Sequence, residues 1–382
     1  MDENRRRMLK ATGTTAFGLA LAGCLGENSG EGDQDTTTEE SDDTTTEGSE
    51  ETTTESSNGG QNEDVNVGMV YATGGLGDKS FNDMAQRGAQ QAEDEYGISF
   101  DEAEPETNSD FSRAQRDYAE SGDYDLISCI GFAQAETLSE NAPAYPDQNW
   151  MLVDATVDES NVANYVFREQ DGSFQVGHLA GLVTTTELEA GAGSTNPDET
   201  TVGFVGGVEA PLIKKFEAGF KAGVEHADDS IEVVTSYVGD FNDTSGGKEA
   251  ALTMYQDSGA DIVYHAAGAT GVGVFQAAQQ AGRFAIGVDA DQSRSEPDFS
   301  DVILASMVKR VDTAVFTAIE NVVNGEFQGG GDPQVLGLED DGVEAVYGDE
   351  LGSEIPDDVK SSLDESRQAI IDGDIEVPDS PE

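Results

Sequence analysis

The chain has 382 residues, of which 78 are Asp or Glu and 19 are Lys or Arg, so its formal net charge is −59. A chain this acidic is repelled by phosphate backbones and anionic lipid head groups, which excludes nucleic-acid binding and membrane attachment through basic patches. Self-repulsion of such a surface is screened in concentrated salt, where the Debye length is about 3 Å at 1 M. The composition therefore indicates a salt-loving source.

The first residues predict an export signal followed by a lipidated cysteine. Arginines at positions 5–7 precede Met8, Leu9 and Lys10, which resembles a twin-arginine signal read by an export receptor. The apolar run 11–22 is shorter than the roughly 20 residues of a membrane span and fits the apolar region of a signal. It ends in the tetrapeptide LAGC, which is similar to a lipobox, although a chance cysteine is the alternative. We expect a signal over residues 1–23 and a lipid on Cys24 that holds the protein at the outer face of the cytoplasmic membrane.

Residues 24–64 predict a disordered tether. Between Glu27 and Asp64 there are 14 acidic residues, no Lys or Arg, and three Thr triplets. Such a segment cannot bury a core, and its like charges keep it extended. With Cys24 lipidated, Cys129 is the only cysteine left, so the mature chain forms no intrachain disulfide.

From residue 65 onward, apolar strand candidates alternate with amphipathic helix candidates in two series. Alternation with short connections is typical of parallel sheets with right-handed crossovers, so two series predict two doubly wound α/β domains. We expect the chain to cross between them three times, which gives a first lobe of residues 65–156 plus 291–330 and a second of 157–290 plus 331–382. The expected strands are 65–71, 98–103, 126–130, 150–153, 201–205, 231–238, 262–265, 285–288 and 302–308, and the expected helices are 81–96, 109–121, 133–141, 212–227, 246–257, 271–280 and 311–324.

In such sheets a ligand lies beyond the carboxyl ends of the strands, and in a two-domain protein it lies where two sets of strand ends face each other. The segments that follow the predicted strands are rich in Asp, Asn, Gly and Phe and contain few lysines. This composition suits a small neutral ligand that carries hydroxyl groups and a flat ring.

Several of these segments resemble the basic membrane lipoprotein family, the substrate-binding proteins of ABC importers, and the resemblance covers residues 65 to about 324 in order. It implies the type I periplasmic-binding-protein fold, two lobes joined by a hinge, a purine nucleoside bound between them, an importer permease as partner, and a monomer. The motifs are TGGLGDKSFN at 73–82, WMLVD at 150–154, GFVGG at 203–207, DFND at 240–243, AAGATG at 266–271, GVDADQ at 287–292 and SMVK at 306–309.

Carried over residue by residue, the resemblance implies a set of ligand contacts. Asn82 and Asp154 are polar partners of the base. Phe241 stacks on the base and Phe81 faces it from the other side. Gly268, Asp289 and Lys309 surround the ribose. Many members have an Asp where this chain has Ala72-Thr73, which leaves the preferred base open. The seven positions are Phe81, Asn82, Asp154, Phe241, Gly268, Asp289 and Lys309.

The chemistry of these side chains supports the same roles. An aromatic face stacks on a base for about 1–3 kcal/mol. An Asn side chain both donates and accepts hydrogen bonds, whereas a carboxylate such as that of Asp289 accepts from vicinal ribose hydroxyls. Lys309 is one of seven lysines after residue 23 and follows an apolar strand, so it requires a specific partner, either the ligand or a nearby acid.

Each position also has a purely structural interpretation. In that interpretation Phe81 and Phe241 are core rings. Asp154 caps the segment that follows it, and Asp289 is a surface acid. Gly268 is a turn residue, and Asn82 belongs to a first helical turn.

Two alternatives for the function stay open: the same fold with a flavin or a sugar as ligand, and an extracellular nucleoside-processing enzyme. We expect no catalytic residue, metal or cofactor, since His178, His226 and His265 lack metal-ligand spacing and no nucleophile motif is present.

Overall fold

The computed structural model describes residues 65–381. The predicted export signal, Cys24 and the tether lie outside the described residues. Among the described helices, none is both long and apolar enough to cross a membrane.

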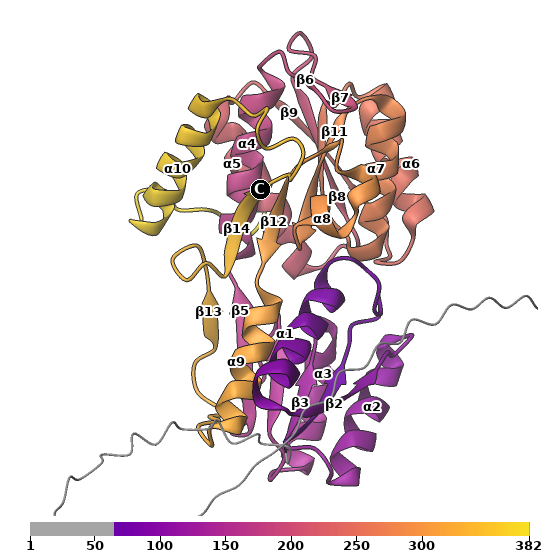
Figure 1. Ribbon diagram of the computed structural model, residues 1–382, viewed down its shortest axis with the longest axis vertical. Helices are drawn as coiled ribbons and strands as arrows, with labels where there is room; N and C mark the ends of the chain where they lie inside the picture. The colour runs from indigo at the N-terminus through magenta and orange to yellow at the C-terminus, as the bar shows by residue number, and fades with distance from the viewer. Residues whose placement is uncertain (1–64, 382) are drawn as a thin grey trace, which may run out of the picture. The chain divides into compact units, whose positions relative to one another are not determined.

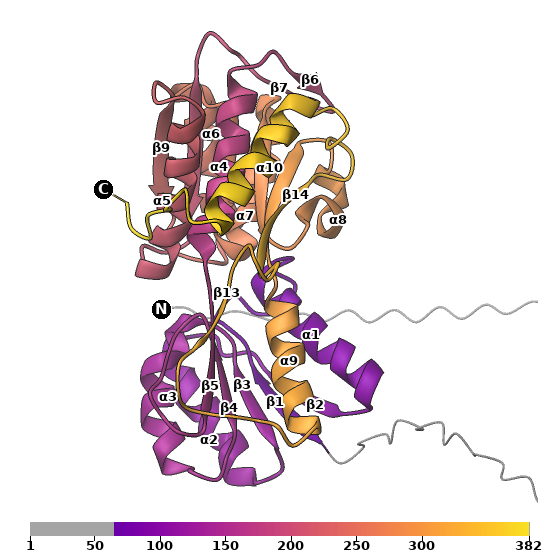
Figure 2. The same cartoon turned by 90° about the vertical axis from the view of Figure 1, so that its left-hand side faces the viewer.

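The first sheet has six parallel strands in the order β13-β5-β4-β3-β1-β2. Helices α1 and α9 pack together on one face of this sheet, and α2 and α3 cover the other face (Figure 2). The elements are β1 (Asn66–Val70), α1 (Phe81–Tyr96), β2 (Ser99–Ala103), α2 (Asn108–Ser121), β3 (Leu126–Cys129), α3 (Ala135–Asn141), β4 (Trp150–Val153), β5 (Val162–Phe167), α9 (Val311–Val323) and β13 (Gln334–Leu336).

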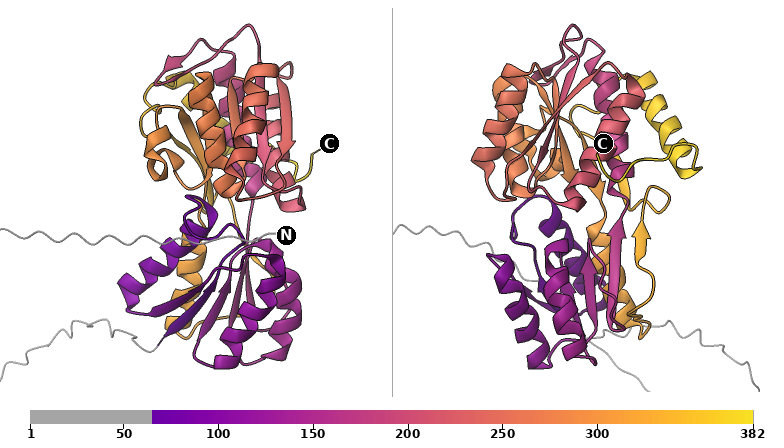
Figure 3. Two further views of the ribbon diagram at one scale, coloured as in Figure 1. Left: turned by 90° about the vertical axis from the view of Figure 1, so that its right-hand side faces the viewer. Right: turned by 180° about the vertical axis from the view of Figure 1, so that it is seen from behind.

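The second sheet has the order β14-β12-β11-β10-β8-β9 and is parallel except for β14, which runs antiparallel to β12. Helices α4, α5 and α10 lie on one face, and α6 and α7 lie on the other (Figures 1 and 3). The elements are α4 (Glu169–Thr184), β8 (Thr201–Gly206), α5 (Pro211–Ala227), β9 (Glu232–Tyr237), α6 (Thr244–Asp257), β10 (Ile262–Ala266), α7 (Gly271–Ala281), β11 (Phe284–Asp289), α8 (Gln292–Ser295), β12 (Ile303–Lys309), β14 (Val343–Tyr347) and α10 (Asp357–Ile371), with a short hairpin of β6 (Glu189–Ala190) and β7 (Gly193–Ser194).

The two sheets repeat one strand order, so β4 of the first sheet corresponds to β11 of the second. Helices cover both faces of each sheet, which explains why the inner strands read as nearly continuous apolar runs. The predicted pair of doubly wound α/β sheets is confirmed. Because corresponding strands end at corresponding edges, the residues that follow β4 and β11 occupy equivalent places in the two halves.

The strand pairing divides the chain at points that differ from the predicted division. β5 and β13 belong to the first sheet, whereas β12 belongs to the second. The chain therefore passes between the sheets at Arg168, at Arg310 and over residues 337–342. The backbone N–H of Arg168 donates to Leu336 and that of Arg310 donates to Gly342, so the three passages lie side by side. A strand joins a sheet through bonds to its neighbour, and the order of polar segments along the chain does not reveal that neighbour.

Candidate ligand-binding site

A cavity of about 310 Å³ lies between the two sheets, lined by the segments at the carboxyl ends of their strands. Its volume is within the range of about 300–1,000 Å³ that is typical of small-molecule sites. All seven predicted ligand positions line it, so the structure brings them together at one place, while their contact with a ligand stays a prediction. They are Phe81, Asn82, Asp154, Phe241, Gly268, Asp289 and Lys309.

Phe241 follows β9 and lies half-buried against backbone at the cavity wall. A methyl group on Gly207 would overlap the ring, so the glycine allows the ring to lie directly on the chain. Gly268 has the left-handed φ of 54° and approaches the backbone oxygen of Phe241. It thus serves a turn, as the structural interpretation held, and also lines the cavity. The arrangement offers a firmly supported ring face for a planar ligand.

Lys309 is the last residue of β12 and its side chain is only 1% exposed. The Nζ atom lies 2.7 Å from Oδ2 of Asp154, which directly follows β4, and 3.4 Å from Oε1 of Glu169. It also lies 5.0 Å from the centroid of the Phe81 ring. A buried ammonium requires such partners. The acid partner predicted for Lys309 is therefore present, and the same side chain lines the cavity.

The cluster around Lys309 carries an excess of negative charge. Three buried carboxylates, those of Asp154, Glu169 and Asp289, surround one ammonium. Burial raises the pKa of Asp154 and of Asp289, and Lys309 opposes the rise only in part. Burial would lower the pKa of Lys309, but the three carboxylates together raise it. Such a site favours a ligand that brings hydrogen-bond donors.

Asp154 and Asp289 occupy the equivalent positions after β4 and at the end of β11, and both have left-handed φ angles, 69° and 63°. Non-glycine residues rarely adopt this conformation, which concentrates at functional sites. Oδ1 of Asp154 is buried and, among the described residues, has no hydrogen-bond partner. Asp289 accepts a hydrogen bond of 2.6 Å from the hydroxyl of Ser80. Each sheet therefore presents one carboxylate to the cavity with accepting capacity left over.

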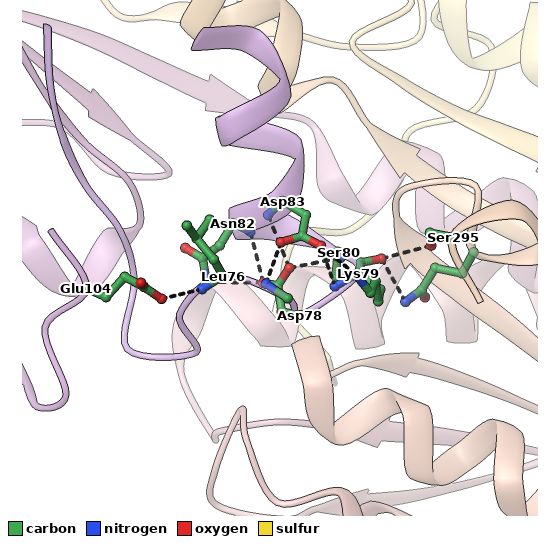
Figure 4. Close-up of polar contacts among 10 residues, drawn as sticks. Leu76, Asp78, Lys79, Ser80, Asn82, Asp83, Glu104 and Ser295 are labelled. Carbon is green, nitrogen blue, oxygen red and sulfur yellow. Dashed lines mark hydrogen bonds and ion pairs between the residues drawn. The ribbon is translucent and has the colours of Figure 1, made fainter. Parts of the chain in front are cut away.

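Asn82 lies in the first turn of α1, and much of its amide is used within the protein. Its Oδ1 accepts from the backbone N–H of Ala72 at 2.9 Å. Its Nδ2 donates to Asp78 at 3.1 Å, as Figure 4 shows. One N–H and one lone pair remain for a ligand. Asn82 therefore ties the end of β1 to α1, as well as lining the cavity.

Asp78 organises the loop before α1 and is not among the predicted site residues. Its carboxylate accepts from the backbone N–H groups of Ser80, Asn82 and Asp83 at 2.9–3.2 Å, in the manner of a helix cap (Figure 4). Burial raises its pKa to about 6, although these hydrogen bonds oppose the rise. An acid just ahead of a predicted helix is the signal that would have found it.

The same loop reaches from the first sheet to the second. Lys79, with the left-handed φ of 55°, turns its carbonyl toward α8, where Nε2 of Gln292 and the hydroxyl of Ser295 donate to it at 3.2 and 3.1 Å (Figure 4). Together with the pairs Ser80–Asp289 and Lys309–Asp154, these bonds hold the two halves against each other around the cavity.

Comparison with known proteins identifies the family. The sequence profile described as "ABC transporter substrate-binding protein PnrA-like" matches residues 65–381. The chain belongs to this family. Its members are solute-binding proteins of ABC transporters, which take a small molecule and a permease as partners, and the resemblance to basic membrane lipoproteins is thereby confirmed.

Individual relatives agree with this assignment. An uncharacterised lipoprotein of Pyrococcus furiosus is 33% identical over 336 residues, covering 81% of this chain and 80% of the relative. The "ABC transporter nucleoside-binding protein BmpA" of Lactococcus lactis is 30% identical over 335 residues, covering 82% and 89%. The crystal structure of an ABC transporter solute-binding protein from Aeropyrum pernix superposes with a TM-score of 0.73 at 31% identity and covers 83% of this chain and 94% of that one. The type I periplasmic-binding-protein fold is confirmed.

Proposed function

We propose that the protein is a lipid-anchored receptor that binds a purine nucleoside in the cavity between its two sheets and delivers it to an importer permease. The observation that carries the proposal is the convergence of an aromatic face, two strand-end carboxylates and one buried lysine on a single cavity. The nucleoside-binding relative from Lactococcus lactis supports the same ligand class.

The cavity supplies the contacts that a base and a ribose require. The ring of Phe241 stacks on the base, and Phe81 faces it from the other side. Oδ1 of Asp154 accepts a hydrogen bond from a ring or exocyclic N–H group, and Asp289 accepts from ribose hydroxyls. Lys309 donates to a ribose oxygen. Unpaired buried acceptors cost about 1–3 kcal/mol each, which favours a ligand that satisfies them.

The predicted closure of two lobes is supported by the contacts that cross the cavity. Asp154 and Ser80 belong to the half built on the first sheet, and Lys309 and Asp289 to the half built on the second. A ligand held by both halves stabilises the state in which they meet. The closed form is then what the permease recognises.

The signal over residues 1–23, the lipid on Cys24 and the tether of residues 24–64 place the receptor at the outer face of the cytoplasmic membrane. The relative named as a lipoprotein supports this location. In this proposal the tether lets the binding domain reach the permease while the lipid keeps it at the membrane.

Titration calorimetry in concentrated KCl tests the proposal. The purified protein is titrated with adenosine, guanosine, inosine, uridine, riboflavin and ribose, and each nucleoside is recovered afterwards to detect free base. We expect purine nucleosides to bind one to one and to be recovered intact. Binding of riboflavin or ribose alone would favour the other ligands of this fold, and release of free base would favour an enzyme.

A further inference from the structure

Glu169 is a buried acid that does not line the cavity. It is the first residue of α4 and directly follows Arg168, where the chain passes from the first sheet to the second. Its side chain is 0% exposed, although the neighbouring sequence, Arg-Glu-Gln-Asp, is entirely polar. A fully buried carboxylate requires a specific reason, because isolated charges are costly to remove from water.

The two oxygens of Glu169 face two lysines. Oε1 lies 3.4 Å from Nζ of Lys309, on the cavity side, and Oε2 lies 3.3 Å from Nζ of Lys215 on α5. The Lys215 side chain is 32% exposed, so it connects the buried carboxylate to the surface. Oε1 has no hydrogen-bond partner of good geometry among the described residues, so its contact with Lys309 is an ion pair.

Close packing of α4 on α5 fixes the place of this carboxylate. A methyl group on Gly219 of α5 would collide with the carbonyl of Gln170, and one on Gly223 would collide with that of Phe174. The two helices therefore touch through backbone at the start of α4. This contact fixes the backbone next to Glu169.

We propose that Glu169 is a positioning residue for the ligand: it holds the ammonium of Lys309 in place on the second-sheet side of the cavity, where that ammonium meets Asp154 and the ligand. The inference rests on the proposed function. Lys309 ends β12 immediately before the passage at Arg310, and Glu169 begins α4 immediately after the passage at Arg168. The pair thus fixes the lysine to one half of the protein while Asp154 approaches it from the other.

The charge of Glu169 also affects the protonation of Lys309. The groups that face this ammonium are the carboxylates of Asp154, Glu169 and Asp289 and the rings of Phe81, Phe167 and Phe216; the Tyr264 hydroxyl interacts with two of the acids. Burial tends to lower the pKa of Lys309 and the acids raise it. Removing the Glu169 charge therefore lowers the pKa of Lys309, and the ammonium is lost at a less alkaline pH.

The test compares adenosine affinity at pH 7 and pH 10 for the whole protein and for Glu169→Gln. Adenosine is the probe because its base carries no acidic proton in this range. We expect wild-type affinity to be similar at both pH values, whereas Glu169→Gln binds about tenfold more weakly at pH 7 and loses about another tenfold by pH 10. In the variant, a second substitution of Lys309→Arg, which stays charged at pH 10, should remove the pH dependence.

Glu217→Gln is the matched control. Glu217 is also a buried acid on α5 paired with a lysine, Lys221, but it does not line the cavity. We expect the adenosine affinity of Glu217→Gln to equal that of the wild type at both pH values.

The outcomes separate the inference from the proposed function. A wild-type protein that binds no purine nucleoside overturns the proposed function, and the inference with it. Wild-type binding together with an unchanged affinity and pH profile in Glu169→Gln overturns the inference alone. If Glu169→Gln does not fold, the same comparison uses Glu169→Asp, which withdraws the charge by one methylene; about threefold weaker binding supports the role, and wild-type behaviour contradicts it.

Discussion

Replacing Lys309 with methionine should destabilise the protein strongly and in a pH-dependent way. The lysine and its partner Asp154 have side chains 1% and 3% exposed, and Glu169 is also buried. The substitution leaves Asp154 in the interior without a cation, and Glu169 keeps only its contact with Lys215. Breaking a buried ion pair by removing one partner costs about 3–5 kcal/mol, and we expect a loss in this range at pH 8.

The sign of the pH dependence follows from the acids. Burial already raises the pKa of Asp154 above its unfolded value, and removing Lys309 raises it further. An acid whose pKa is raised on folding binds protons more tightly in the folded state, so folding becomes more favourable as the pH falls through that raised pKa. The stability loss in Lys309→Met should therefore shrink between pH 8 and pH 5. Salt screens buried pairs little, so the loss should persist in concentrated KCl.

Urea denaturation at pH 8 and pH 5 measures both effects. Lys214→Met is the control, since Lys214 forms an exposed pair with Glu209 and its replacement should change stability little. A loss below about 1 kcal/mol in Lys309→Met, or one that is the same at both pH values, would refute the reasoning that the lysine neutralises a buried acidic cluster.

Three further substitutions are checked by nucleoside titration. Phe241→Ala should weaken binding about ten- to a hundredfold through lost stacking, whereas Phe299→Ala, which lies outside the cavity, should not change it. Gly207→Ala places a methyl group where the Phe241 ring lies, so it should weaken binding, though no more than Phe241→Ala does. Full affinity in Gly207→Ala would show that the ring is not fixed there. Asp289→Asn keeps the left-handed backbone that Asn tolerates but loses a charged acceptor, so binding should weaken by about 1–3 kcal/mol, against no change for Asp291→Asn.

Much of the fold could be predicted because its local patterns are strong. The helix 81–96 was expected from its periodicity and from Gly97, which adopts the left-handed conformation that ends helices. The strand 150–153 was expected from its continuous apolar run, and the structure buries every residue of it. The predicted strand ends then indicated the segments that line the cavity, because carboxyl ends of parallel strands meet at one edge. The resemblance to the family indicated the individual residues within those segments.

Other features depend on contacts between distant segments. Glu169 lies in a polar run typical of a solvent-exposed surface, and it is buried only because α5 and β12 pack over it. β5 shows an apolar run, but its membership of the first sheet is decided by pairing with β4 and β13. The passages between the sheets were therefore misplaced along the chain, since no local pattern specifies which neighbour a strand will join.

The most direct test of the central claim is a crystal structure of the protein grown with a purine nucleoside. We predict the base against Phe241 with a donor on Oδ1 of Asp154, and the ribose hydroxyls within hydrogen-bond distance of Asp289 and Lys309. A nucleoside bound elsewhere on the protein, with this cavity empty, would contradict the account.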